Sequence, residues 1–185
     1  MMLIHKGTQT LETERLILRR FCLEDAQAMF DNWASDDEVT RFMTWPSHDS
    51  VEITQMVLND WLAGYDKDDF YLWAITVKEE GITPIGSISV VHLHDRTAKA
   101  EIGYCIGRNW WHRGIMTEAL GAVMNYLFDE VGVNRIQACH DPRNPNSGKV
   151  MMKCGMKYEG TLRQWDCNNQ GICDASFYAL LRSER

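Results

Sequence analysis

The spacing of apolar residues predicts a chain of alternating strands and helices. The apolar residues Leu16 and Leu18 stand at alternate positions, which predicts a strand over residues 15–20. Apolar side chains at helical spacing then predict a helix over residues 23–34 and a second helix that begins near residue 49. The apolar stripes are Ala26, Met29, Phe30 and Trp33 in the first helix, and Ile53, Val57 and Trp61 in the second. The run 49–52, Asp-Ser-Val-Glu, predicts a capping box at the start of the second helix.

The remaining residues predict a sheet with helical crossovers and a hairpin. A third helix carries the stripe Met116, Leu120, Val123 and Leu127, and ends near residue 129. The other elements are strands at 70–77, 85–93, 99–107 and 133–138, a short helix at 147–154 closed by Gly155, and hairpin strands at 158–167 and 172–180. The order βααβββαβαββ predicts an α/β (α+β) arrangement around one twisted sheet of about seven strands with about four helices. At this length we expect a single domain over residues 1–185.

Composition narrows the class of protein. The apolar fraction of 45% is ordinary for a globular domain. No apolar run approaches the ~20 residues of a membrane span, so we expect no membrane partner. The first residues lack a signal-peptide pattern, and the six cysteines form no Cys-x-x-Cys pair. We therefore expect reduced thiols, a cytoplasmic location and no metal site.

Charge is unevenly distributed. The formal net charge is −7; residues 1–70 hold 14 acids and 6 bases, whereas residues 71–185 hold 12 acids and 13 bases. A basic second half suits a polyanionic ligand, and an acidic first half suits a cationic substrate and argues against nucleic acid. The alternative is that the acidic residues only solvate helix surfaces.

The segment from Trp111 to Glu118 is the strongest indication of chemistry. It joins the strand at 99–107 to the third helix through a glycine, Gly114. Backbone N–H groups in such a loop, together with a helix N-terminus, form an anion site. Arg108 and Arg113 flank the loop and can add charge-assisted hydrogen bonds. The pattern therefore predicts a diphosphate cradle, although an ordinary strand–turn–helix would also use a glycine here.

A second segment, residues 144–156, makes the pattern specific. Together the two segments resemble the GNAT superfamily of N-acetyltransferases, and most closely its RimJ/RimL-type branch, which includes acetyltransferases of ribosomal-protein N-termini. The first motif is matched by Trp111, Gly114, Thr117, Glu118 and Ala119, and the second by Asn144, Ser147, Val150, Lys153 and Gly155. Residues 12–19, 159–163 and 174–182 extend the likeness over nearly the whole chain. Met116 and Met156 depart from it, and Met116 would crowd the loop unless its side chain enters the core.

The resemblance implies a GNAT fold with a mostly antiparallel mixed sheet, and transfer of acetyl from acetyl-CoA to a primary amine without an acyl-enzyme. The strand at 99–107 would diverge from its neighbour and offer its amides to the pantetheine arm. The implied coenzyme-binding residues are Tyr104, Cys105, Ile106, Arg108, Arg113, Gly114, Ile115, Met116, Thr117, Asn144, Ser147 and Lys153. No metal is implied. The branch often forms dimers through its C-terminal strands, so a homodimer is expected.

Three side chains are candidates for the chemistry. Ser147 is the candidate donor to the leaving thiolate, or else a helix cap. An ammonium must lose its proton before it attacks, and Glu101 or Asp166 can accept it. We favour Glu101, on the strand that carries the thioester; the branch has a longer Glu where Asp166 stands. Either carboxylate can instead orient the substrate. Trp45 is expected to line the acceptor site or to be a core residue.

The leading prediction is an N-acetyltransferase acting on a protein or peptide N-terminal α-amine. A small amine, an amino acid or an antibiotic is the second acceptor class. A GNAT-fold module that binds coenzyme A without turnover is the alternative from another functional class.

Overall fold

The computed structural model describes residues 3–185, and within them eight strands form one open mixed sheet. The strand order is β1-β2-β3-β4-β5-β6-β8-β7. The strands are β1 (Leu11–Glu12), β2 (Leu16–Arg19), β3 (Leu72–Val77), β4 (Gly86–His94), β5 (Lys99–Ile106), β6 (Arg135–His140), β7 (Lys157–Asn168) and β8 (Gly171–Leu181). All neighbouring pairs are antiparallel except β5 and β6, which run parallel. The predicted mixed α/β fold is confirmed, with the two-residue β1 as an additional strand.

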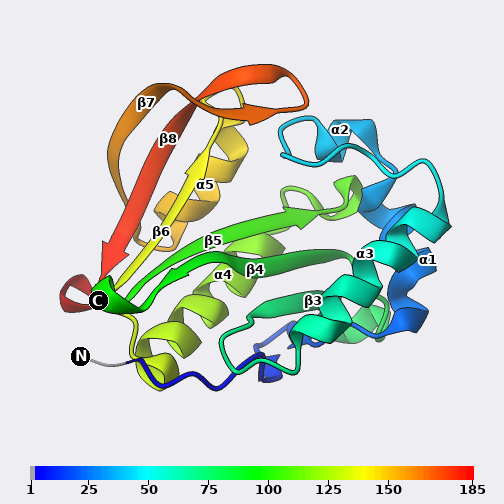
Figure 1. Ribbon diagram of the computed structural model, residues 1–185, viewed down its shortest axis with the longest axis horizontal. Coiled ribbons are helices and arrows are strands. Elements are labelled where there is room, and N and C mark those ends of the chain that lie inside the picture. Colours follow the sequence, from blue (N-terminus) through cyan, green and yellow to red (C-terminus); the bar gives the residue numbers. More distant parts are fainter. Residues whose placement is uncertain (1–2) are drawn as a thin grey trace.

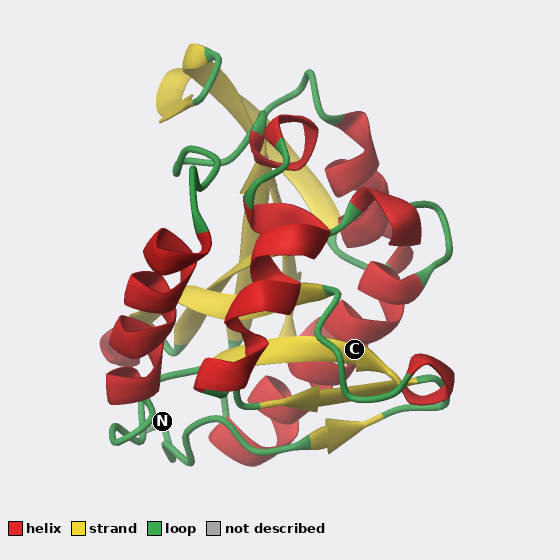
Figure 2. Ribbon diagram, turned by 90° about the vertical axis from the view of Figure 1, so that its right-hand side faces the viewer, coloured by secondary structure: helices red, strands yellow, loops and turns green. Residues whose placement is uncertain are grey.

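Helices cover both faces of the sheet (Figure 2). They are α1 (Ala26–Met29), α2 (Asp37–Thr40), α3 (Val51–Gly64), α4 (Ile115–Tyr126) and α5 (Pro145–Lys153). On one face α4 and α5 pack on a large core that includes Leu16, Leu18, Trp73 and Ile136. On the other face α1 and α3 enclose a smaller core around Trp33 and Leu58. The predicted stripe is confirmed, since Met116, Leu120 and Val123 of α4 are buried, as is Leu127 in the π-helical turn Leu127–Val131 that follows α4.

The first predicted helix is broken. A 3₁₀ turn at Leu23–Asp25, the single turn α1 and a π-helical turn at Phe30–Ala34 replace one continuous helix. Asp25 explains the irregular start, because it is buried and accepts two hydrogen bonds of 2.7 Å from Arg19 and one from the Cys22 N–H. The short α2 was not predicted; Asp36 caps it by accepting from the Glu38 N–H.

The predicted face of α3 was wrong. Thr54 and Leu58 are fully buried, whereas Ile53 is exposed and Val57 and Trp61 are only partly covered. The predicted capping box is also not formed: Ser50 is the N-cap, its side chain caps nothing, and Glu52 therefore stands one position too early to complete a box. The helix α5 begins at Pro145, two residues before the predicted start, and Gly155 ends it with φ +81° as predicted.

The strands β5 and β6 diverge after a short paired segment (Figure 1). They pair at Lys99, Ala100 and Glu101 of β5, and no further, although both strands continue. We call the opening between the diverging strands β5 and β6 the fork. On the β6 side of the fork, the sheet continues with the hairpin of β8 and β7. The fork therefore opens the middle of the sheet between two well-supported halves, as the family resemblance implied.

Candidate active site

The loop before α4 presents unpaired backbone N–H groups. His112 and Gly114 both have left-handed backbones, with φ of +61° and +76°, and they curl the chain into the helix start. Within residues 3–185, nothing accepts a hydrogen bond from the N–H groups of residues 112 to 117. The loop therefore has the donors of an anion site at a helix N-terminus.

The carbonyl groups around this loop are occupied instead. The Trp111 indole donates to the Ile106 carbonyl at 2.8 Å, and Arg15 donates to the Arg113 carbonyl at 3.1 Å. The Glu118 N–H bonds the Gly114 carbonyl, and the Cys154 thiol bonds the Thr117 carbonyl at 3.3 Å. These four carbonyl groups accept hydrogen bonds within the protein, whereas the N–H groups of residues 112 to 117 donate none within the described part of the chain. The loop is therefore suited to an anion rather than a cation.

Glu118 fastens this loop to the first strands. It accepts hydrogen bonds from the Thr13 hydroxyl at 2.5 Å, the Arg15 N–H at 2.9 Å and the Arg15 guanidinium at 2.7 Å. Burial opposes ionisation of Glu118, but the bonds from Thr13 and Arg15 outweigh it and hold its pKa below the usual range. Glu118, which the motif singled out, thus has a structural task here.

Removing this carboxylate should destabilise the protein. We expect Glu118→Ala to lower the free energy of unfolding by about 1–2 kcal/mol, because several donors lose their partner while Arg15 stays partly solvated. Since the folded pKa of Glu118 is depressed, this stability is present above the unfolded pKa of ~4.3 and is lost as pH falls below it. Urea unfolding at pH 7 and pH 4 measures both effects. Glu38→Ala, which removes an exposed ion pair with Arg41, should change stability by less than ~0.5 kcal/mol.

The two arginines near the loop are already paired. Arg113 donates to Glu80 at 2.8 Å, and the Trp110 indole donates to the same carboxylate at 2.8 Å. The bonds from Trp110 and Arg113 lower the pKa of Glu80. Arg108 bonds Asp36 at 2.5 Å. Both arginines flank the loop, and in this structure each guanidinium is engaged by a carboxylate while staying about half exposed.

Met116 does not obstruct the loop. Its side chain is 6% exposed and belongs to the large core, so only its backbone N–H faces the loop. Ile115 is buried in the same way.

The open edge of β5 offers two of the three amides that were expected there. The Gly107 N–H bonds the Ile85 carbonyl at 2.9 Å, and the register pairs Ser87 with Cys105. Because bonded and non-bonded pairs alternate in an antiparallel ladder, the Cys105 amide faces β4, and those of Tyr104 and Ile106 face the fork. The Ile106 carbonyl confirms this direction by accepting from Trp111. The expected amide contact of Cys105 with the coenzyme is therefore not available, because β4 uses that amide; the Cys105 side chain is buried.

The phenol of Tyr104 meets Ser147 across the fork. The Tyr104 oxygen lies 3.0 Å from both the carbonyl oxygen and Oγ of Ser147. Burial raises the Tyr104 pKa well above its usual value, more than the hydrogen bond with Ser147 lowers it, so the phenol stays protonated. The N-cap of α5 is Asn144, so Ser147 is a first-turn residue and its hydroxyl does not cap the helix.

The helix α5 connects the two ends of the site. Asn144 is partly buried at its start and its side-chain amide has no partner within residues 3–185. At its other end Cys154 contacts Thr117 of α4, and the neighbouring Lys153 is exposed. The length of α5 therefore runs from Ser147 to the loop before α4.

The candidate carboxylate Glu101 lies beside the thiol of Cys139. Glu101 Oε1 is 4.0 Å from Cys139 Sγ on the neighbouring β6. Burial, and then the charges of Glu101 and Asp166, raise the pKa of Cys139 to about 12. Of the two candidate carboxylates, only Glu101 contacts Cys139, which remains a neutral thiol, whereas Asp166 is paired in register with Cys173 of β8. Asp166 is exposed and accepts from the Cys167 N–H at 2.7 Å, after an irregular stretch of β7 between Leu162 and Asp166.

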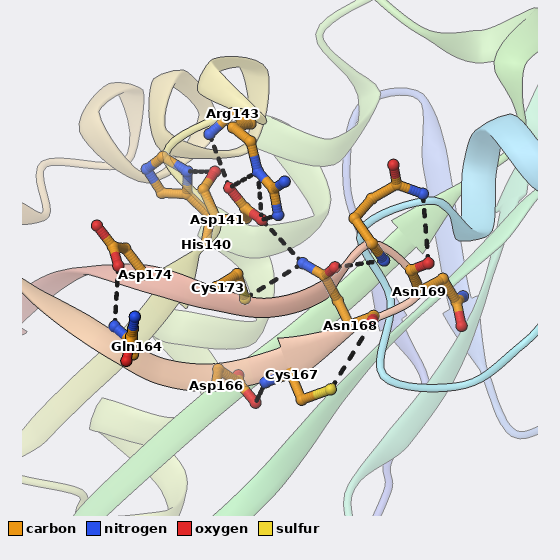
Figure 3. A network of polar contacts seen from close by, with 11 residues as sticks. His140, Asp141, Arg143, Gln164, Asp166, Cys167, Asn168, Asn169, Cys173 and Asp174 are labelled. Carbon is orange, nitrogen blue, oxygen red and sulfur yellow. Dashed lines mark hydrogen bonds and ion pairs between the residues drawn. The ribbon is translucent and has the colours of Figure 1, made fainter.

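The hairpin tip is tied to the loop that carries Trp45. Asn169 donates to the Thr40 and Trp45 carbonyls at 2.8 Å each, and its N–H bonds the Met43 carbonyl. At the base of the tip Asn168 donates to Asp141 at 2.9 Å (Figure 3). The hairpin and this loop therefore form an arch at the open end of the fork.

Asp141 is an ionised carboxylate that binds the hairpin side of this arch through Asn168. Its side chain is buried, and hydrogen bonds from the Arg143 side chain, against the effect of burial, lower its pKa to about 2. The backbone N–H of Arg143 and the amide of Asn168 add to the effect. Asp141 was not predicted as a site residue, because the contact that ties it to the hairpin is with Asn168, 27 positions away, and forms only in the fold.

Trp45 is partly buried at the base of the same arch. Its ring packs on the smaller core and lies 5.6 Å from the ring of His48. Both predicted roles, lining the site and packing, are compatible with this position.

Burial of His48 should make the folding stability of the protein depend on pH. His48 Nδ1 is 2.8 Å from the Thr54 hydroxyl, and burial lowers the pKa of His48. His48 therefore binds a proton more readily in the unfolded chain than in the folded protein. The contribution of neutral His48 to the free energy of unfolding is present above pH ~6.5 and is lost as pH falls toward the folded pKa. We expect the melting temperature to fall between pH 7 and pH 5.5 more steeply in the wild type than in His48→Gln. Equal slopes in differential scanning calorimetry would contradict this.

Comparisons with known proteins agree on the family. A family model described as an acetyltransferase (GNAT) domain matches residues 15–157. An uncharacterized N-acetyltransferase, p20 of Bacillus licheniformis, is 34% identical over 95% of this chain and 98% of its own. The [ribosomal protein uS5]-alanine N-acetyltransferase of Escherichia coli (strain K12) is 34% identical over 35% of this chain and 33% of its own.

A solved structure gives the same fold. The microcin C7 self immunity acetyltransferase MccE, in complex with acetyl-CoA and AMP, superposes with a TM-score of 0.81 at 18% identity, covering 91% of this chain and 93% of MccE. In residues 3–185, no helix is both long and apolar enough to cross a bilayer.

Proposed function

The chain belongs to the GNAT acetyltransferase family, and from that premise we propose that it transfers acetyl from acetyl-CoA to a primary amine, with a protein N-terminal α-amine as the leading acceptor. The uS5-alanine N-acetyltransferase among its relatives supports this acceptor class. The MccE complex supports the choice of acetyl-CoA as the donor.

One observation carries the proposal. The free N–H groups of residues 112 to 117 adjoin the open edge of β5, which Trp111 ties to the loop. A diphosphate fits the N–H groups, and an extended amide arm fits a strand edge that lacks a partner. Coenzyme A contains both in one molecule. Lys153 and Asn144, at the two ends of α5, would add a charge and a hydrogen bond.

The residues around the fork can perform the remaining tasks. Acetyl-CoA supplies the acetyl group as an activated thioester. Glu101 accepts the proton of the ammonium, directly or through water, and Asp166 helps to hold that cation. An amide of β5 that faces the fork donates to the thioester carbonyl; such a donor contributes roughly 3–4 kcal/mol where measured. Ser147, which is hydrogen-bonded to Tyr104, donates a hydrogen bond to the sulfur as it leaves as a thiolate.

Coenzyme binding is tested first. Isothermal titration calorimetry with acetyl-CoA, coenzyme A and ATP should give heat with the first two and little with ATP. Absence of heat with both coenzymes would overturn the proposal.

The acceptor is tested by thiol release. Peptides beginning with Ser, Ala or Leu should release coenzyme A, whereas the same peptides with a blocked N-terminus should not. Release only with small amines, amino acids or an antibiotic would replace the leading acceptor class by the second. Tight coenzyme binding without release for any acceptor would indicate a binding module.

We also infer a homodimer formed along β7. This strand is at the edge of the sheet and exposes Tyr158, Leu162 and Trp165. An exposed apolar edge strand favours pairing with another chain. Light scattering should give twice the chain mass, and Leu162→Lys should shift the protein toward monomer, while Ile82→Lys at an equally open but distant site should not. A wild-type monomer at ~50 μM would contradict this inference.

We also propose that the protein is located in the cytoplasm. The free state of all six cysteines suits a reducing environment such as the cytoplasm, where coenzyme A and new protein N-termini are present.

A further inference from the structure

The buried side-chain amide of Gln137 contacts Glu101, the candidate general base, where β5 and β6 begin to diverge. Glu101 and Gln137 are the last residues paired between β5 and β6 before these strands diverge. Gln137 is 8% exposed, and its Nε2 donates to Glu101 Oε2 at 2.7 Å. The carboxylate is thus held by a side chain of β6 at the last paired position before the two strands diverge.

Two neighbours fix which way this amide points. Arg135 Nε donates to Gln137 Oε1 at 3.2 Å, and a guanidinium can only donate. The ionised Glu101 carboxylate can only accept. A flipped amide would place donor against donor and acceptor against acceptor, so one orientation satisfies both contacts.

The arginine is held in turn by the hairpin. Glu159 of β7 accepts from Arg135 at 2.8 Å and 2.5 Å, one bond to each terminal nitrogen. The hydrogen bond with Glu159 outweighs partial burial and raises the pKa of Arg135. A continuous chain of side chains therefore runs from β7 through Arg135 and Gln137 to Glu101.

We propose that Gln137 is a positioning residue that holds Glu101 in its proton-accepting orientation, with Arg135 holding Gln137. The inference rests on the proposed role of Glu101 as the base. Gln137 occupies Oε2 at 2.7 Å, so the less engaged oxygen is Oε1, which accepts only a long contact of 4.0 Å from the Cys139 thiol. Cys139 stays a neutral thiol and does not add a second charge there. Oε1 is therefore the atom that receives the proton from the amine or from a relay water.

Removing the amide should slow turnover without affecting the coenzyme. Gln137→Met has a similar length but no donor, and should lower kcat about 10–100-fold, since displacing a catalytic group by ~1 Å has effects of that size. The dissociation constant for acetyl-CoA should not change. Gln27→Met is the matched control, because Gln27 also donates to a carboxylate, Asp31, at 2.9 Å on an exposed helix face. Its kcat should equal that of the wild type.

A double-mutant cycle separates positioning from simple support of the sheet. Rates are measured with the peptide that gives the fastest wild-type release of coenzyme A. If Gln137 acts through Glu101, then Glu101→Gln with Gln137→Met should be no slower than Glu101→Gln alone. Effects that multiply, or an unchanged kcat in Gln137→Met, would overturn the inference while leaving the acetyltransferase proposal intact. A full rate in Glu101→Gln would instead overturn the base assignment and this inference together.

A milder variant covers the case in which Gln137→Met does not fold. Arg135→Lys keeps the positive charge near Glu159 but loses the donor that orients Gln137. We expect a several-fold fall in kcat with an unchanged KM for acetyl-CoA, and an unchanged kcat would count against the inference.

Discussion

The Glu101→Gln variant should turn over its amine acceptor about 10²–10⁴-fold more slowly than the wild type, the usual range for loss of a general base. The amide that replaces the carboxylate cannot accept a proton from an ammonium. Binding of acetyl-CoA should be unchanged, because the loop before α4 and the open amides of β5 are untouched. Stopped assays of thiol release at saturating coenzyme, with calorimetry for binding, separate the two quantities.

Two further variants sharpen this test. Asp166→Asn should have a smaller effect than Glu101→Gln, since Asp166 is exposed and one of its oxygens bonds the Cys167 N–H. Glu79→Gln, an exposed carboxylate outside the fork, should behave as the wild type. If Asp166→Asn proved the more damaging substitution, the base would be on the hairpin and Glu101 would be an orienting group.

The Gly114→Val variant should weaken acetyl-CoA binding by about 10–100-fold, equivalent to about 1.4–2.7 kcal/mol. Gly114 has φ +76°, where a β-branched residue is strained. An added Cβ would meet only Arg15 at 3.5 Å, so crowding is not the cause. Relief of the strain must turn the loop, and the N–H groups of residues 112 to 117 would no longer converge. Calorimetry with acetyl-CoA measures the loss.

Two other glycines provide matched controls. Gly132 has φ +84° and open space around it, so Gly132→Val imposes the same strain away from the site. It should lower the melting temperature but leave coenzyme affinity unchanged. Gly121→Ala, within α4 and also in open space, should be neutral or slightly stabilising. Equal loss of affinity in Gly114→Val and Gly132→Val would show a general effect on folding rather than a cradle.

Local periodicity was enough to predict most of the sheet and α4. The alternating Leu16 and Leu18 are fully buried in β2, and the four-residue stripe that begins in α4 faces the core, because each pattern has a single apolar face. The sequence of α3 has apolar residues on adjacent stripes, and periodicity alone could not choose between them. A contact with His48 helps to turn Thr54 inward, and this contact cannot be read from helical spacing.

Site residues that lie in one continuous segment could be predicted from the sequence. Contacts between residues far apart in the sequence could not. The loop at residues 112 to 117 and the start of α5 are continuous motifs, so their residues could be named. The phosphate contact predicted for Arg113 stays a prediction, and its ion pair with Glu80, 33 positions away, could not be read from the motif. Gln137 contacts Glu101, 36 positions away, and Asp141 contacts Asn168, 27 positions away, only when the strands and hairpin assemble.

The position of β8 between β6 and β7 has a consequence for folding. A chain emerging from the ribosome makes β6 and then β7 before β8, yet within residues 3–185 of one chain β7 pairs with β8 alone. The acceptor side can therefore form only after the interior strand has been synthesised and inserted, a step of large sequence separation, which is slow in folding. Until then β7 is an unpaired ribbon with exposed Tyr158 and Trp165, and this interval is when the protein is most prone to aggregate.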